Sequence, residues 1–399
     1  MKYEIETFRL GDICEVVRGG SPRPIIDYIT DDEDGVNWLK IGDVNETDKY
    51  FTHANERIKR SGISKTREVK SGDLILSNSM SFGRAFITLI DGYIHDGWLR
   101  LRCDESTISK EYLYYFLTSS VAQNQFKAVA TGSVVNNLKA DTVRDTLISV
   151  PPLNIQEKIV AVLGTIDKKI VLNNQINNNL EQQATALFKS WFVDFEPWDG
   201  QKPTAWSSAP LGSFVDIRRG GSPRPIQDYL SDEGLRWLKI SDVTSLTVPY
   251  VLDIKEHIRE EGLKKTVFLK AGELVLSNSA TPGIPKILDV DSCIHDGWLY
   301  FPKSELSKYF LYLLFKHIRK ELIALGNGSV FTNLKTDILK AYPIPKADKD
   351  TLNNFDQLVI PLFNAMLNLC KENHALVDLR NLLIQKMMSG EIDVSEVDI

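Results

Sequence analysis

The chain has 399 residues, of which 43% are hydrophobic and 25% are charged. This composition is typical of folded globular proteins and excludes disordered and fibrous classes. The 47 basic and 53 acidic residues give a formal net charge of −6, which argues weakly against a free-standing nucleic-acid binder but permits a local basic face. The four cysteines form no CxxC pair, so neither a zinc cluster nor a disulfide framework is indicated.

Membrane insertion and secretion are not expected from this sequence. No apolar run reaches the ~18–20 residues that cross a bilayer, and the first residues lack the apolar segment of a signal peptide. We therefore expect a cytoplasmic protein without a membrane partner.

The chain contains the same domain twice. A separation of 201 residues relates Arg18 to Arg219, and one of 196 relates Gly132 to Gly328, which is too long for a solenoid repeat. The repeated motifs are RGGSPRPI, WLKIGDV and WLKISDV, SGDLILSNS and AGELVLSNS, IHDGWL, and GSVVNNLKAD and GSVFTNLKTD.

Each copy is predicted to be a mixed α/β domain. In the first, short β-type runs at Val36–Val44, Asp73–Asn78 and Trp98–Cys103 precede helical spacing over Lys110–Ala130. Helical spacing recurs at Ser307–Leu325 in the second. Prolines at Val150–Leu153 and Tyr342–Lys346 end the two copies, because proline cannot continue into a helix interior.

A long helix is predicted after each copy. Apolar residues recur every three or four positions over roughly 40 residues, which favours two helices that bury each other as a coiled coil. Asn173 and Asn177 interrupt the first apolar stripe; they either lie in the seam and set its register or face solvent.

We predict an α+β fold: two tandem mixed α/β domains joined by two long helices that pair as an antiparallel coiled coil with pseudo-two-fold symmetry. The predicted segments are domain 1 (1–150), helical spacer 1 (151–195), a linker (196–210), domain 2 (211–347), helical spacer 2 (348–392) and a tail (393–399).

Catalytic motifs are missing from the sequence. It contains no GxxxxGK[ST], no GxGxxG after a strand, and no HExxH or GxSxG. The recurrent titratable pairs are His95–Asp96 and His295–Asp296, but adjacent residues of a strand point to opposite faces, which suits a base and its orienting acid poorly. We therefore expect these histidines and aspartates to form turn hydrogen bonds or to contact a ligand.

Basic and polar loops recur in both copies and favour DNA binding. RGGSPRP presents arginine, serine and backbone N–H groups that suit phosphates or base edges, although its arginines could instead pair with the acidic run Asp31–Asp34. Basic runs lie at Glu56–Lys70 and Lys255–Lys270, and the LSNS asparagines suit adenine but equally suit a buried turn. The loops Met80–Phe86 and Ala280–Lys286 differ between copies, which fits either two domains that read different targets or drift in an unimportant loop. The residues expected to contact DNA are Arg18, Ser21, Arg23, Lys40, Arg60, Lys65, Asn78, Arg84, Ser133 and Lys139, and in the second copy Arg219, Ser222, Arg224, Lys239, Lys264, Lys265, Asn278, Ser329 and Lys335.

Three segments resemble a known family. QEKIVAVLGTIDKKI at Gln156–Ile170, LFKSWFVDFEP at Leu187–Pro197 and LRNLLIQKMMSGEI at Leu379–Ile392 are similar to the helical regions of type I restriction-modification specificity subunits. The duplicated motifs resemble the target recognition domains of that family, and the resemblance covers nearly the whole chain.

The resemblance implies a non-catalytic specificity subunit that binds double-stranded DNA and reads a bipartite target, one half with each domain. It further implies two methyltransferase subunits, which bind S-adenosylmethionine, and restriction subunits, which translocate and cut DNA with ATP and Mg²⁺. This chain itself is expected to hold no cofactor or metal. Because its two domains are so alike, similar inverted half-sites are expected.

Two alternatives remain at this point. A solitary enzyme is disfavoured by the missing motifs, and a purified chain that methylates or cuts DNA unaided would support it. A coiled-coil protein adaptor without DNA readout is disfavoured by the repeated basic loops, and a gel shift with the assembled complex separates it from a DNA reader.

Overall fold

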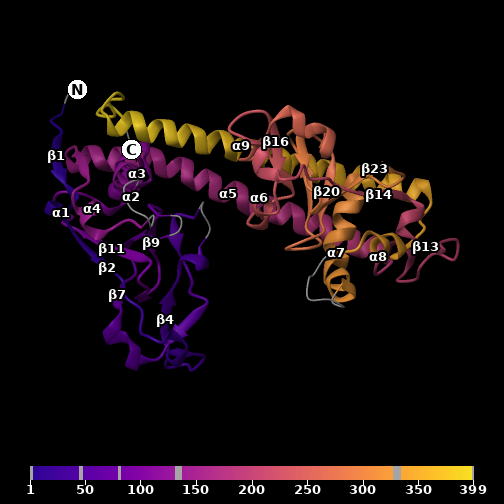
Figure 1. Cartoon of the computed structure of the whole chain (residues 1–399), viewed down its shortest axis with the longest axis horizontal. Helices are drawn as coiled ribbons and strands as arrows, with labels where there is room; N and C mark the ends of the chain where they lie inside the picture. Colours follow the sequence, from indigo (N-terminus) through magenta and orange to yellow (C-terminus); the bar gives the residue numbers. More distant parts are fainter. Residues whose placement is uncertain (1–2, 45–47, 80–81, 131–136, 327–333, 398–399) are drawn as a thin grey trace. The chain divides into compact units, whose positions relative to one another are not determined.

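The computed structural model describes residues 3–44, 48–79, 82–130, 137–326 and 334–397. The chain divides into two compact units, Met1–Lys169 with Leu376–Ile399 and Ile170–Ala375. We call them the first and second units. Each contains one copy of the repeat together with a segment of each long helix (Figure 1).

The first unit is built on two five-stranded sheets and a two-stranded one. Their strands are short apolar runs such as Leu74–Ser77, in which all four residues are buried, so both faces of that sheet are covered. The first sheet has the order β2 (Cys14–Arg18), β11 (Trp98–Cys103), β8 (Leu74–Ser77), β9 (Ala85–Thr88) and β5 (Tyr50–Phe51). The second has the order β3 (Ile29–Thr30), β6 (Glu56–Ile58), β4 (Val36–Leu39), β10 (Gly92–Ile94) and β7 (Arg67–Val69), and β1 (Glu6–Arg9) pairs with β12 (Leu147–Val150).

The second unit repeats this topology strand for strand, which confirms the predicted tandem domains. Its first sheet has the order β14 (Val215–Arg219), β23 (Trp298–Ser304), β20 (Leu274–Ser277), β21 (Pro285–Leu288) and β17 (Tyr250–Val251). Its second has the order β15 (Leu230–Ser231), β18 (His257–Ile258), β16 (Leu235–Leu238), β22 (Ser292–Ile294) and β19 (Val267–Leu269), and β13 (Ser208–Pro210) pairs with β24 (Pro343–Pro345).

The helix expected over Lys110–Ala130 is broken in the structure. It consists of α2 (Lys110–Thr118) and α3 (Ser120–Ala130), whereas α7 (Lys308–Gly326) is continuous in the second unit. Ser119 between them has an extended backbone, and its hydroxyl accepts a hydrogen bond from the Ala122 N–H, so it caps α3. The shorter helices are α1 (Leu10–Ile13), α4 (Ala140–Arg144), α6 (Ser241–Thr244) and α8 (Thr336–Ala341).

The two predicted long helices are present as α5 (Leu153–Phe192) and α9 (Lys349–Met388), each of 40 residues (Figure 1). They pair antiparallel within each unit. In the first unit, Arg380 Nη1 donates to Asp167 Oδ1 at 2.8 Å. In the second, Asn173 Nδ2 donates to Glu372 Oε2 at 2.8 Å and Asn177 Nδ2 to Cys370 Sγ at 3.7 Å, so higher residue numbers on α5 meet lower ones on α9.

The two asparagines lie in the seam between α5 and α9. Asn173 is 0% exposed and Asn177 3%, which decides against the solvent-facing alternative. Buried seam amides set the register of a helix pair, because any other register leaves their Nδ2 donors without these partners.

Within the described ranges, no helix combines the length and the apolar character that a membrane crossing requires. The same residues contain no group of three or more histidine, cysteine, aspartate or glutamate side chains placed to hold a metal ion.

Candidate nucleic-acid interface

Three motifs of the first copy meet at one carboxylate. Asp96 follows β10, and its Oδ1 accepts a hydrogen bond from Ser21 Oγ at 2.7 Å while its Oδ2 accepts one from Arg23 Nη2 at 3.3 Å. Its main-chain oxygen accepts from Arg18 Nε at 3.1 Å and from Asn78 Nδ2 at 3.0 Å. We call these five residues the first clasp.

The second copy builds the same arrangement around Asp296, which we call the second clasp. Ser222 Oγ donates to Asp296 Oδ1 at 2.7 Å and Arg224 Nη2 to Oδ2 at 3.0 Å. The main-chain oxygen of Asp296 accepts from Arg219 Nε and, at 3.4 Å, from Asn278 Nδ2. Two separate copies of one geometry indicate that the clasp is an inherent feature of the domain.

Close backbone approach explains the glycines of these turns. A Cβ added to Gly19 would lie 2.1 Å from the main-chain oxygen of His95, and one added to Gly220 would lie 2.3 Å from that of His295. Any side chain there would push the RGGSPRP turn off the strand end, so only glycine lets the arginine reach the aspartate.

The clasp aspartates are held in their charged form. The hydrogen bond from Ser21 lowers the pKa of Asp96, and the nearby charge of Arg23 acts in the same direction. Burial alone would raise the pKa of Asp296, but the hydrogen bond from Ser222 and the charges of Arg219 and Arg224 outweigh it, so this pKa is also lowered.

The adjacent histidines form turn hydrogen bonds, as the favoured interpretation expected. Gly97 N donates to His95 Nδ1 at 2.7 Å and Gly297 N to His295 Nδ1 at 2.8 Å, so this nitrogen carries no proton. Burial lowers the pKa of both histidines, with the neighbouring aspartates opposing only in part. Both imidazoles are therefore neutral near pH 7.

The clasp arginines remain open to solvent. The side chain of Arg23 is 80% exposed and that of Arg224 is 77% exposed, and each guanidinium has five N–H donors in total. The structure decides against the alternative pairing with the acidic run Asp31–Asp34, because Arg23 pairs with Asp96, which is distant in the sequence.

The two LSNS asparagines are part of the buried turn. Asn78 and Asn278 are each 3% exposed, and both donate to the main-chain oxygen of the clasp aspartate. Buried amides in this position hold the turn together, as the buried-turn alternative expects, and a contact of Asn78 or Asn278 with adenine stays a prediction.

Comparison with known proteins identifies the domain that carries the clasps. A family model described as the type I restriction modification DNA specificity domain matches residues 2–182 and 203–356. The chain belongs to this family. The MjaIX specificity subunit of a type I restriction enzyme from Methanocaldococcus jannaschii is 25% identical over 416 residues, covering 98% of this chain and 94% of that protein.

Two further comparisons agree. The HindI specificity subunit of a type I restriction enzyme from Haemophilus influenzae is 22% identical over 436 residues, covering 90% of this chain and 94% of that protein. The crystal structure of a type I restriction-modification system S subunit from M. genitalium has a similar fold, with a TM-score of 0.50 and 15% identity, covering 97% of this chain and 96% of that one.

Other predicted contacts of the specificity domains have structural partners. Lys40 forms an ion pair with Glu56, and Lys239 forms the equivalent pair with Glu256. The Lys65 ammonium donates to the Tyr28 hydroxyl at 3.2 Å, and Lys265 to that of Tyr229 at 2.7 Å. These contacts lie within each domain and stabilise it. The ammonium groups of Lys65 and Lys265 also lie over the rings of Tyr28 and Tyr229.

The remaining predicted residues fall into three groups. Arg60 and Lys264 are exposed on the short 3₁₀ helices η3 (Arg60–Lys65) and η7 (Glu260–Lys265), and Lys139 and Lys335 are exposed at the N-caps of α4 and α8. Arg84 is half-buried. Ser133, Ser329 and residues 80–81 of the Met80–Phe86 loop lie outside the described residues.

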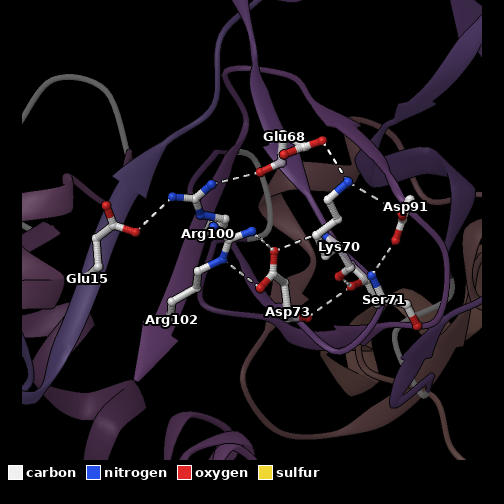
Figure 2. Close-up of polar contacts among 9 residues, drawn as sticks. Glu15, Glu68, Lys70, Ser71, Asp73, Asp91, Arg100 and Arg102 are labelled. Atoms are coloured by element: carbon white, nitrogen blue, oxygen red, sulfur yellow. Dashed lines mark hydrogen bonds and ion pairs between the residues drawn. The ribbon is translucent and has the colours of Figure 1, made fainter. Parts of the chain in front are cut away.

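Sequence reasoning missed a charge network of the first specificity domain, whose two arginines are replaced by Tyr300 and Pro302 at the equivalent positions of the second. Figure 2 shows Arg100 and Arg102 pointing from β11 toward acidic residues. Arg100 Nη2 donates to Glu15 Oε2 at 2.8 Å, and Arg102 binds Asp73 with two hydrogen bonds of 2.8 and 2.7 Å. The signal was present as arginines alternating with leucines in WLRLRC. Because acidic partners balance the charges of these guanidiniums, we assign them to the support of β11.

Proposed function

We propose that this chain reads a bipartite site on double-stranded DNA, one half with each specificity domain, and that the clasps hold the reading arginines. The observation that carries this proposal is the twofold occurrence of one geometry, in which a buried turn and a charged aspartate aim an exposed arginine outward. A protein that needed only a stable turn would gain nothing from leaving Arg23 and Arg224 open to solvent.

Arginine suits either of two DNA contacts. A guanidinium can donate two parallel hydrogen bonds to guanine O6 and N7, or bind a backbone phosphate. The first contact discriminates bases and the second does not, so the two are separable by experiment.

We further propose that the chain itself is non-catalytic and docks two methyltransferase subunits and the restriction subunits. Family membership supports this part, and α5 and α9 are suited to docking because they expose apolar side chains such as Leu172, Ile176 and Leu382. S-adenosylmethionine would bind to the methyltransferase subunits, and ATP and Mg²⁺ to the restriction subunits. The net charge of −6 disfavours DNA binding by the chain alone, so the docked partners would supply much of the affinity for DNA.

The test compares Arg23→Ala and Arg224→Ala in the complex with its methyltransferase subunits. Each is expected to weaken binding by about 1–3 kcal/mol and to relax base preference in one half-site only, if the arginine reads a base. Long-read mapping of methylated sites and DNA titration measure these effects. Arg9→Ala is the matched control, because Arg9 is 65% exposed and pairs with Asp145 at 3.4 Å outside the clasp.

The outcomes separate the alternatives. A uniform loss of affinity across sequences assigns the arginines to phosphates. Wild-type affinity and methylation in both variants would overturn the role of the clasps, and a complex that shifts no DNA at all would favour the protein adaptor.

A further inference from the structure

Two cysteines of the first unit face each other across neighbouring strands. In the antiparallel ladder of β2 and β11, Cys14 is the direct register partner of Cys103. One step further along the ladder, Asp104 N donates to Ile13 O at 2.9 Å, and at the other end Gly19 N donates to Trp98 O at 2.9 Å. Hydrogen-bonded and non-hydrogen-bonded pairs alternate in such a ladder, so Cys14 and Cys103 form a non-hydrogen-bonded pair.

This register brings the two thiols within bonding reach. In a non-hydrogen-bonded pair the Cα atoms lie about 4.5 Å apart, which falls inside the range of roughly 4.4–6.8 Å found for disulfides. A disulfide could therefore form here without moving the strands apart.

The two thiols differ in a way that suits stepwise oxidation. Cys14 is 6% exposed, whereas Cys103 at the end of β11 is partly exposed. The interaction between the two thiols lowers the pKa of Cys103 and, together with burial, raises that of Cys14. Cys103 is thus the thiol that ionises first and that a small oxidant can reach.

We propose that Cys14 and Cys103 are a redox pair that closes to a disulfide when the protein meets a peroxide. The Cys103 thiolate attacks one peroxide oxygen, the O–O bond breaks, and Cys103 becomes a sulfenic acid as hydroxide leaves and takes up a proton to form water. Cys14 then attacks the sulfenic sulfur, and a second water leaves with the Cys14 proton. In sum, two thiols and one hydrogen peroxide give one disulfide and two waters, and a dithiol reductant reverses the step.

The cross-link would act on one unit only. In the second unit the counterpart of Cys14 is Val215, which faces Ser304 because this ladder shifts by one residue between Asp216 and Arg218, and neither residue can be oxidised in this way. The β2–β11 ladder that the disulfide closes carries the first clasp at its opposite end, where Arg18 pairs with Leu99. Oxidation is therefore expected to stiffen the strands under the first clasp and leave the second unchanged. This inference does not depend on the proposed function.

The remaining cysteines are internal controls. Cys293 and Cys370 are buried in the second unit, and burial raises the pKa of each thiol to about 11. Neither has a cysteine as its strand or helix partner: Cys293 lies opposite Trp237 and Phe268, and Cys370 contacts Asn177.

The test oxidises the reduced full-length chain with hydrogen peroxide. Remaining thiols are alkylated under denaturing conditions, disulfides are then reduced and labelled with a second, mass-distinct reagent, and peptides are quantified by mass spectrometry. Cys14 and Cys103 are expected to carry the second reagent together, which marks them as disulfide-bonded. Cys293 and Cys370 are expected to carry the first alkylating reagent, which marks them as free thiols. The oxidised chain should also gain about 5–10 °C in the Tm of the first unit, reversibly with dithiothreitol.

Variants copied from the second unit keep the test interpretable. Cys14→Val and Cys103→Ser place the residues of the intact second unit at the same register, so both are expected to fold. Cys14→Val should leave Cys103 as a sulfenic acid that dimedone traps, and Cys103→Ser should abolish both the cross-link and the Tm gain. The proposal is overturned if all four cysteines of the peroxide-treated wild type take the first label, or if Cys103 proceeds to sulfinic acid without a Cys14 cross-link.

Discussion

At the scale of single residues, the clasps show how a carboxylate can hold an arginine without hiding it. Asp96 uses one oxygen for Ser21 and the other for Arg23, so the serine fixes the carboxylate and the carboxylate fixes the direction of the guanidinium. A side chain that is positioned in advance loses less conformational entropy when it binds. The arginine therefore keeps its N–H donors for a ligand at a low ordering cost.

The substitution Asp96→Asn tests this positioning. The amide keeps the shape of the carboxylate and can still accept from Ser21, but it loses the ion pair with Arg23, so the free energy of unfolding should fall by about 1 kcal/mol or less. The Kd of the assembled complex for the first half-site should nevertheless rise several-fold, because the guanidinium is no longer held. Urea unfolding and DNA titration measure the two quantities.

The matched control is Asp31→Asn, which removes the same charge outside the clasp. A more positive chain should bind DNA equally well or more tightly, so the expected weakening in Asp96→Asn has the opposite sign to a general charge effect. Equal Kd values for both variants would remove the positioning role.

The neutral histidines predict a pH dependence of stability. Burial lowers the folded-state pKa of His95 below its ordinary value of 6.5, so between these two values the unfolded chain binds more protons than the folded one. The stability contributed by neutral His95 is complete above pH 6.5 and is lost as the pH falls through the folded-state pKa. The Tm of the wild type should therefore fall more steeply between pH 7.5 and 5.5 than that of His95→Gln.

Thermal unfolding across this pH window provides the measurement, with His53→Gln as the control because His53 is exposed. If His95→Gln and His53→Gln keep the wild-type slope alike, protonation of His95 does not limit stability in acid.

At this scale the sequence predicted the right turns and only some of the right roles. The motif RGGSPRP and the pair His95–Asp96 were recognisable because their residue types are locally unusual. The burial of Asn78 was not, because it depends on how β8 meets a loop that is close in space but outside the motif. The same holds for Asp96 as the partner of Arg23, a pairing across 73 residues.

At the scale of secondary structure, α5 and α9 were predictable because a long apolar period needs no tertiary information. The break at Ser119 was not predictable, because serine is a frequent helix cap but also a common surface residue. The polar anchors of α5 were not predictable. Tyr115 donates to Asp167 at 2.6 Å in the first unit, and Tyr312 donates to Glu181 at 2.6 Å in the second.

The two seam asparagines are expected to respond in opposite ways to leucine. The Oδ1 atoms of Asn173 and Asn177 are both buried without a hydrogen-bond partner among the described residues, so the two side chains differ in what their Nδ2 groups donate to. Asn177 donates one weak hydrogen bond to Cys370 Sγ, so Asn177→Leu should raise the unfolding free energy by about 1 kcal/mol. Asn173 donates to both Glu372 and Asn373, so Asn173→Leu should lower it by about 1–3 kcal/mol.

Denaturant unfolding of the full chain measures both changes. Asn178→Leu is the control, because Asn178 is exposed on the same helix and should change stability by less than about 0.5 kcal/mol. Destabilisation of similar size in Asn173→Leu and Asn177→Leu would mean that packing volume decides the outcome and the hydrogen bonds do not.

At the scale of the whole molecule, the duplication was the strongest signal in the sequence, and the two units are nevertheless chemically distinct. The strand orders agree throughout, yet the first unit alone has the Arg100 and Arg102 network and the Cys14–Cys103 pair. Features that both copies of the domain share are those that the fold requires. Chemical differences between the copies are found by comparing equivalent residues, which needs the strand register of both sheets.

The helices should set the spacing between the half-sites. Both α5 and α9 run from one unit into the other, so four residues added to α5 alone must bulge or shift the seam, whereas additions to both helices keep the pairing. Because Asn173 faces Glu372 and Asn177 faces Cys370, the matched change duplicates Asn173–Ile176 together with Cys370–Asn373. Each insertion adds roughly 6 Å and about 40° beyond one turn, so the apolar stripes still meet.

A duplex advances about 3.4 Å per base pair, so the double insertion is expected to yield an active complex whose target keeps both half-sites and gains one or two base pairs of spacer. Long-read mapping of methylated sites measures the spacer length of the target directly. Matched insertions of two residues rotate the stripe by about 200° and should give an inactive protein, because the seam residues then face solvent. If the four-residue double variant methylates only sites with the parental spacer length, the helices do not set the spacing between half-sites. Helices without that role can lengthen without changing the target.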